Sequence, residues 1–165
     1  MLNYIELANN YKPDNEIKIL LVGEAPPPNG KNYFYSVPQN YKPKSNIESD
    51  TSLPGTIFNH FFEKPPNNSS EYQDYLIKLK TNGIFLIDIY EHPIQVRNNK
   101  EDSLPIIFSD SNLENLEYRI QSLISEKSEI IFLLARTYKK EYISKLKNKF
   151  NTAKFIRWID FRLKR

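Results

Sequence analysis

Short apolar runs alternate with amphipathic segments along most of the chain. Four runs predict buried strands, at residues 17–23, 84–89, 129–135 and 154–159. Three of them lack strict alternation of apolar and polar positions, which is typical of parallel strands covered on both faces. The pattern therefore predicts a sheet that is mostly parallel and lies at the centre of the fold.

The segments between these runs predict helices. Residues 71–80 place apolar side chains on one face, and another helix begins at a capping box formed by Ser111 and Glu114. A shorter helix begins after Gly55, and a later one carries its apolar face at Tyr138, Tyr142, Leu146 and Phe150. This order predicts one α/β domain over residues 1–165, with three α/β/α layers and a central, mostly parallel four-stranded sheet.

Ligands of such folds bind outside the carboxyl ends of the strands. Right-handed crossovers bring the strand-to-helix loops to that edge, so we expect residues 24–36, 90–110, 136–138 and 160–165 there. Functional residues are therefore expected in these four loops or next to them.

Composition excludes several classes of protein and site. The 165 residues are 39% hydrophobic and 26% charged, which is typical of a globular chain. Because cysteine is absent, the sequence excludes disulfides, thiolate metal sites and cysteine-bound iron–sulfur clusters. With only two histidines, we expect no metal and no cofactor. No apolar run is long enough to span a membrane and no signal peptide is visible, so we expect a cytoplasmic monomer without a membrane partner.

Charge is distributed unevenly along the chain. The net charge is +3, yet residues 136–165 contain eleven Lys or Arg against Glu141 and Asp160, a local balance of +9. Such clustering is typical of proteins that bind a phosphate backbone, which makes DNA a candidate partner. The candidate phosphate contacts are Arg136, Lys139 and Lys140. The alternative is a helix whose lysines merely face solvent.

The first candidate loop reads Gly-Glu-Ala-Pro-Pro-Pro from Gly23 to Pro28. Three consecutive prolines carry no amide hydrogen, which argues against a phosphate-binding loop. A rigid turn with Glu24, followed by Tyr33, Phe34 and Tyr35, is suited to holding a flat base beside a carboxylate. The alternative is a stiff turn followed by aromatic residues that only pack.

Three segments resemble motifs of the uracil-DNA glycosylase superfamily. They are residues 18–26, which contain Gly-Glu-Ala-Pro, the Leu-Pro-Gly-Thr-Ile-Phe segment at 53–58, and residues 83–90. The resemblance implies hydrolysis of the N-glycosidic bond of a base flipped out of DNA. It implies that Glu24 acts on water or on the developing cation. It also implies that an aromatic residue, preferably Phe34 and otherwise Tyr33 or Tyr35, stacks on the base, and that Asp88 faces the base edge.

The chain departs from that family pattern after its second and last strands. Asp88 stands where relatives carry an amide, and an ionised carboxylate cannot donate to a carbonyl unless burial raises its pKa. The His-Pro-Ser motif expected after the last strand is missing, which leaves Arg162 as the nearby cation. His92 follows the second strand and is a further candidate at the edge.

Three functions remain open from the sequence. The first is a glycosylase-like enzyme that removes a damaged or deaminated base from DNA. The second is an inactive nucleic-acid-binding or regulatory module with the same fold. The third is a hydrolase of a small nucleoside-like molecule.

Overall fold

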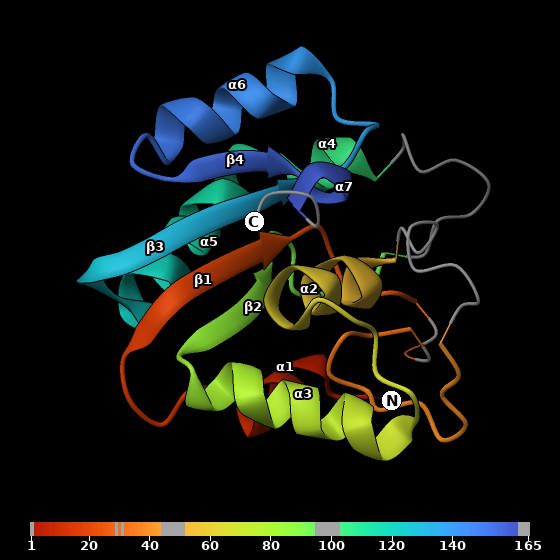
Figure 1. Cartoon of the computed structure of the whole chain (residues 1–165). Helices are drawn as coiled ribbons and strands as arrows, with labels where there is room; N and C mark the ends of the chain where they lie inside the picture. Colours follow the sequence, from red (N-terminus) through yellow and green to blue (C-terminus); the bar gives the residue numbers. More distant parts are fainter. Residues whose placement is uncertain (1, 29, 31, 44–51, 95–102, 162–165) are drawn as a thin grey trace.

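The computed structural model describes residues 2–28, 30, 32–43, 52–94 and 103–161. Its four strands are β1 (Ile17–Gly23), β2 (Ile84–Asp88), β3 (Ile124–Leu134) and β4 (Lys154–Arg157). They form one sheet in the order β2-β1-β3-β4, and every neighbouring pair is parallel (Figure 1). The predicted four-stranded parallel sheet is therefore confirmed, with β1 and β3 at its centre.

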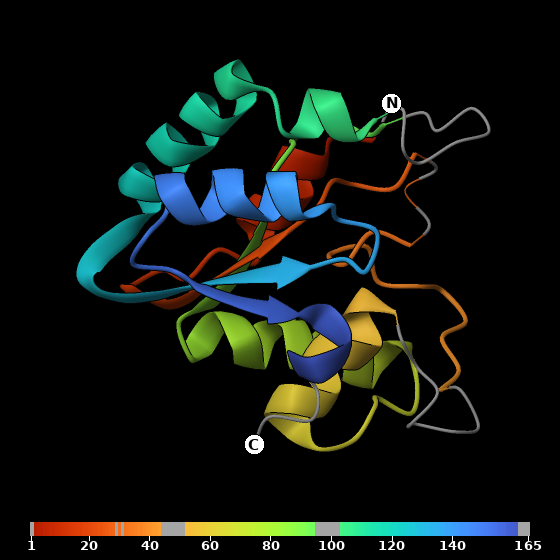
Figure 2. The same ribbon diagram turned by 90° about the horizontal axis from the view of Figure 1, so that it is seen from above.

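Helices cover both faces of this sheet. One face carries α1 (Tyr4–Asn10), α4 (Leu104–Ile107), α5 (Asp110–Leu123) and α6 (Lys140–Lys149). The other carries α2 (Leu53–Phe62), α3 (Ser69–Thr81) and α7 (Trp158–Phe161), as the view along the sheet shows (Figure 2). The predicted three-layer α/β/α arrangement is confirmed.

Several element boundaries differ from those predicted. Helix α1 was not expected; Asn3 caps it by accepting from the backbone N–H of Glu6. Helix α5 is capped by Ser109, whose hydroxyl accepts from the N–H of Asn112, and not by Ser111. Strand β4 ends at Arg157 and the chain turns directly into α7, where residues up to 159 were predicted to be extended.

An aromatic cluster fills the space between the sheet and α2 and α3. Phe58 is fully buried, and its ring lies 4.9 Å from that of Tyr72 and 5.3 Å from that of Tyr75. The ring of Phe34 joins this cluster at 5.6 Å from Phe58, and the Tyr72 hydroxyl donates to the Phe34 carbonyl over 2.8 Å. The loop after β1 is thereby anchored in the core by its own aromatic residues.

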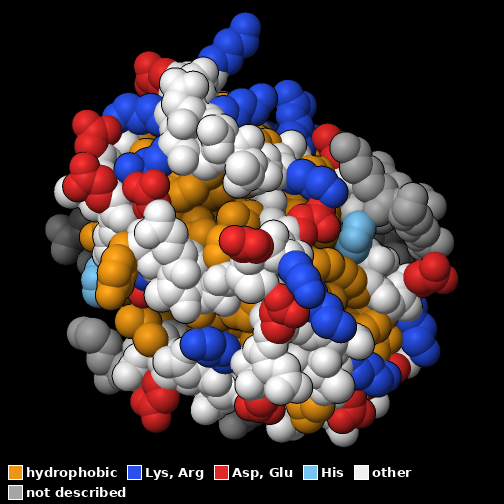
Figure 3. All heavy atoms as spheres, turned by 90° about the vertical axis from the view of Figure 1, so that its left-hand side faces the viewer, with side chains coloured by type: hydrophobic (Ala, Val, Ile, Leu, Met, Phe, Trp, Pro, Cys, Tyr) orange, Lys and Arg blue, Asp and Glu red, His pale blue; other side chains and the backbone are white. Residues whose placement is uncertain are grey.

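The end of the molecule at which the strands begin has a mixed surface. Basic and acidic side chains are interspersed on it, with hydrophobic side chains visible between them (Figure 3). No helix in the described part of the chain is long and apolar enough to cross a membrane.

Candidate functional site

The carboxyl ends of β1 and β2 bring Glu24 and Asp88 to the same edge of the sheet. Gly23 is the register partner of Asp88, and Glu24 follows it. The pairing continues past both strands, because the N–H of Ile89 donates to Gly23 and the N–H of Tyr90 donates to Glu24, each over 3.0 Å. A Cβ atom at Gly23 would lie 2.9 Å from Oδ1 of Asp88. Glycine at this position therefore leaves the space that the Asp88 carboxyl occupies.

Asp88 is half-buried, and it lines a cleft. Burial raises its pKa to about 7; the positive charge of Arg119 opposes this shift and the negative charge of Glu24 adds to it. Among the described residues, none donates a hydrogen bond to this carboxyl group. Asp88 is therefore a carboxyl group that exchanges its proton near neutral pH.

Tyr138 is a third residue near Glu24 and Asp88 at this edge of the sheet. It follows β3, its side chain is buried, and its ring packs edge-on against Phe108 at 5.0 Å. Burial raises the pKa of its hydroxyl well above the ordinary value, and the negative charge of Glu24 raises it further. The sequence pattern placed Tyr138 on an apolar helix face; the structure places its hydroxyl beside Glu24.

Arg119 of α5 holds the end of β2 in place. Its guanidinium donates to the carbonyl of Asp88 over 3.0 Å and to that of Ile89 over 2.8 Å. Its Nε lies 3.5 Å from a carboxylate oxygen of Glu91, and 15% of its side chain is exposed. Sequence reasoning missed Arg119, although its spacing from Leu116 places it at the border of the apolar face of α5.

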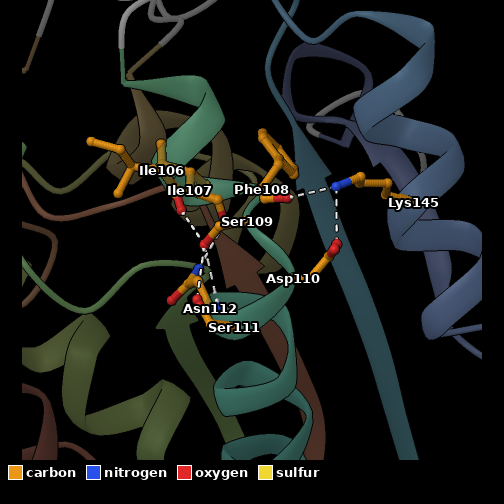
Figure 4. Close-up of polar contacts among 8 residues, drawn as sticks. All are labelled: Ile106, Ile107, Phe108, Ser109, Asp110, Ser111, Asn112 and Lys145. Carbon is orange, nitrogen blue, oxygen red and sulfur yellow. Dashed lines mark hydrogen bonds and ion pairs between the residues drawn. The ribbon is translucent and has the colours of Figure 1, made fainter.

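The junction of α4 and α5 supports the same region (Figure 4). Asn112 donates from its amide to the carbonyls of Ile89 and Ile107, over 3.1 and 2.7 Å. Lys145 of α6 donates to the carbonyl of Phe108 and contacts Asp110 at 3.0 Å. These bonds join α6 to the α4–α5 junction and keep the ring of Phe108 against Tyr138.

A cleft of about 190 Å³ lies between α1 and α5, alongside β2. This volume is below the ~300–1,000 Å³ of sites for drug-sized ligands, so the cleft is suited to a smaller molecule. The Tyr4 hydroxyl donates to the carbonyl of Pro27, and the Tyr33 hydroxyl donates to that of Tyr4. The residues that define the cleft include Tyr4, Pro26, Tyr33, Asp88, Glu91 and Arg119.

The three aromatic residues predicted to bind a base lie in two different environments. Tyr33 borders the cleft, whereas Phe34 is 3% exposed and packs against Phe58 and Tyr35. Tyr35 is also buried; its hydroxyl donates to the carbonyl of Leu86 and accepts from the N–H of the same residue. Phe34 and Tyr35 are not brought to the cleft, because the aromatic cluster and the β2 backbone hold them.

Two further predicted residues are His92 and Arg162. His92 is exposed beside the ring of Tyr90, in a shallow depression that also contains Ser111 and Asn115. Arg162 lies outside the described residues.

The three predicted phosphate contacts, Arg136, Lys139 and Lys140, are exposed just before and at the start of α6. Within the described ranges, none of the three forms an ion pair. Further along α6, by contrast, Lys145 pairs with Asp110 at 3.0 Å and Lys149 with Glu117 at 2.9 Å. Two lysines of α6 are therefore paired with α5, whereas Arg136, Lys139 and Lys140 are exposed near the carboxyl edge.

The described residues contain no group of three or more His, Asp or Glu side chains that would hold a metal ion. Comparison with protein-family models, with curated proteins and with solved structures found no match.

Proposed function

We propose that the protein hydrolyses the N-glycosidic bond of a nucleobase, as a uracil-DNA-glycosylase-like enzyme with Asp88 as general acid and Glu24 as the residue that acts on water. The observation that carries the proposal is the Asp88 carboxyl, which lines a cleft, has a pKa of about 7 and lies within the field of a second carboxylate. A pKa near the working pH is the property that a general acid requires. Two carboxyl groups in different environments are a common basis for dividing acid and base roles.

The proposed reaction balances with these two groups. Protonated Asp88 donates its proton to the departing base as the bond between the sugar carbon and the base nitrogen breaks, and the bonding electrons go to the base. Water adds to the sugar carbon and its proton passes to Glu24. The products are a free base and a sugar that carries a hydroxyl group.

Two neighbouring residues, Arg119 and Tyr138, influence Asp88 and Glu24. Arg119 fixes the backbone of Asp88 and, through its charge, limits the rise of the Asp88 pKa. The buried Tyr138 hydroxyl lies within the field of the Glu24 carboxylate. Both act through the catalytic residues and are therefore positioning residues.

DNA is the partner proposed for this site. Arg136, Lys139 and Lys140 are exposed at the same edge, where they would contact phosphates on either side of a flipped base. Neutralising Lys139 and Lys140 together should then reduce the slope of log affinity against log salt by roughly 0.7–0.9 for each phosphate that no longer meets a positive charge.

A free nucleoside is the second candidate substrate, and the charges of the cleft favour it. The charged residues that line the cleft include Asp88, Glu91 and Arg119, and the guanidinium of Arg119 is already bonded to two carbonyls. A phosphate next to Asp88 and Glu91 would be repelled. A substrate without phosphate avoids that repulsion.

Release of free base from matched substrates tests the proposal. Oligonucleotides that contain uracil, hypoxanthine, xanthine, adenine or cytosine are compared with the corresponding nucleosides, and the base is quantified by chromatography. We expect release from one series, loss of it in Asp88→Asn and Glu24→Gln, and a rate that falls as pH rises above about 7. Asp14→Asn, at an exposed carboxylate of the opposite edge, is the control that keeps full activity.

Absence of base release from every substrate would overturn the proposal. Salt-dependent DNA binding without release would instead establish a binding module. Release that persists in Asp88→Asn would remove Asp88 from the mechanism.

A further inference from the structure

The charges around Asp88 indicate what kind of molecule its carboxyl group binds. Glu24 approaches from the loop after β1, and Glu91 from the loop after β2. The Tyr33 hydroxyl donates to the carbonyl of Tyr4, and burial keeps it protonated by raising its pKa. Within the described part of the chain, Arg119 is the cation that acts on Asp88, and its donors are directed at two backbone carbonyls and at Glu91. The inner end of the cleft therefore attracts positive charge and hydrogen-bond donors.

The walls of the cleft select for a flat ring. The rings of Tyr4 and Tyr33 meet edge to face at 4.8 Å, and Pro26 and the β2 side chains add apolar surface. Aromatic rings and apolar walls favour a planar ligand, and a cationic ring gains further from the tyrosine faces. Shape and charge thus point to the same class of molecule.

We propose that the cleft between α1 and α5 binds a flat heterocycle whose edge carries a ring nitrogen next to an amino group, with Asp88 bonded to both. Such an amidine edge matches a carboxyl group in two protonation states. A neutral Asp88 donates to the ring nitrogen and accepts from the amino group. After the proton moves to the ring nitrogen, the same two bonds join a carboxylate and a cation, which strengthens both.

A lactam edge, with a ring N–H next to a carbonyl, does not share this property. It pairs with neutral Asp88, but a lactam carbonyl is too weakly basic to take the proton, and an ionised Asp88 would oppose one oxygen to another. Glu24 and Glu91 worsen that repulsion. The cleft therefore discriminates against the edges of uracil and hypoxanthine and in favour of those of cytosine and adenine.

This inference rests on the proposed function only in taking the bound ring to be the base of the substrate. The binding itself requires no catalysis. It is therefore testable with small rings that have no sugar and no bond to cleave.

Benzamidine and benzamide are the matched probes, because they share one ring and differ in the edge that they present. Titration calorimetry of the full chain at pH 8 should show benzamidine binding at least about tenfold more tightly than benzamide. Benzamidine affinity should increase as pH rises through about 7, where Asp88 ionises, and benzamide affinity should decrease. Asp88→Asn should abolish the preference, while Asp14→Asn should leave it unchanged.

Equal binding of the two probes, a preference for benzamide, or no binding of either would overturn the inference. Its failure is separable from that of the proposed function. Tight benzamidine binding without release of any base would leave the inference standing and contradict the hydrolase. Release of uracil and hypoxanthine in preference to cytosine and adenine would support a hydrolase and contradict the amidine edge.

Discussion

The charged side chains at the two ends of the sheet lie in different environments. Where the strands begin, Lys80 pairs with Asp14 at 3.1 Å, and Lys154 pairs with Glu129. Asp14 and Lys154 are mostly exposed to solvent, and basic and acidic groups are interspersed over that surface (Figure 3). Where the strands end, Asp88 is half-buried, and burial raises its pKa to about 7. The carboxyl group whose pKa is raised by burial therefore lies at the end of the sheet where the strands end.

Burying a carboxyl group so that its pKa is raised reduces the stability of the fold at neutral pH. Surface ion pairs contribute little and need no function to explain them. A carboxyl group whose pKa is raised by burial is maintained against the stability of the fold, and such groups concentrate at functional sites. The contrast between the two ends is therefore the physical basis of the proposed function, and the following changes test it.

Arg119→Ala should have the largest effect. It removes two hydrogen bonds to carbonyls at the end of β2 and leaves Asp88 and Glu91 without their cation, so we expect a loss of roughly 3–5 kcal/mol. Urea denaturation measures this loss. Arg119→Lys is the matched control; it keeps the charge but lacks the planar donors, so it should recover only part of the stability. If Arg119→Ala is as stable as the wild type, the charged groups at this end contribute no more to stability than those at the other end.

The pH dependence conferred by Asp88 should be next in size. Its pKa rises from 3.8 in the unfolded chain to about 7 in the fold, so between these values the folded protein holds a proton that the unfolded chain has lost. Stability from this group therefore decreases as pH rises from about 4 to about 7, by on the order of 2–4 kcal/mol, and stays low above.

Asp88→Asn should remove that decrease, so the variant should gain stability relative to the wild type as pH rises from 4 to 8. Denaturation curves at several pH values measure the difference. Asp14→Asn, at a carboxylate that is 82% exposed, should show none. Parallel profiles of wild type and Asp88→Asn would contradict the raised pKa.

Gly23→Ala should have an intermediate effect. The new methyl group would lie 2.9 Å from Oδ1 of Asp88, and we expect crowding to cost about 1–3 kcal/mol. Asp88→Ala should relieve the crowding, so the double variant should be more stable than the sum of the single changes predicts. Thermal denaturation of the four proteins measures this coupling; strict additivity would show that the two side chains do not share the space.

Lys80→Ala should have the smallest effect. Its partner Asp14 is mostly exposed, so removal of the pair should change stability by less than about 1 kcal/mol. High salt should reduce even this difference. If Lys80→Ala were destabilised as much as Arg119→Ala, the charged groups at the two ends would contribute equally to stability.

The fold was predictable because its signals are local. Apolar runs and amphipathic segments identified all four strands and the longer helices, and the crossover rule then predicted the edge where the candidate site lies. Helix α1 escaped prediction because only Tyr4 of its seven residues is buried, which gives no apolar periodicity. The additional length of β3 at Ile124 escaped for the same reason, since its first residues are mostly exposed and polar.

The site was predictable only in part. Glu24 and Asp88 follow from their place at the ends of adjacent strands. Arg119 lies on α5, about thirty residues along the chain from the two carbonyls to which it donates. No local sequence pattern indicates that contact. Phe34 was predicted to bind the base, but it packs in the core. In a run of neighbouring aromatic residues, the sequence does not indicate which ring faces the core. The packing around Phe58 decides that question.

The central position of β1 has a consequence for synthesis on the ribosome. Leu20 in its middle is paired with Phe85 on one side and with Ile130 on the other. One side of this apolar strand therefore has no partner until the polypeptide has been translated past β3. A nascent chain stalled between those points would present a hydrophobic strand edge, which is a substrate for chaperones and a template for aggregation.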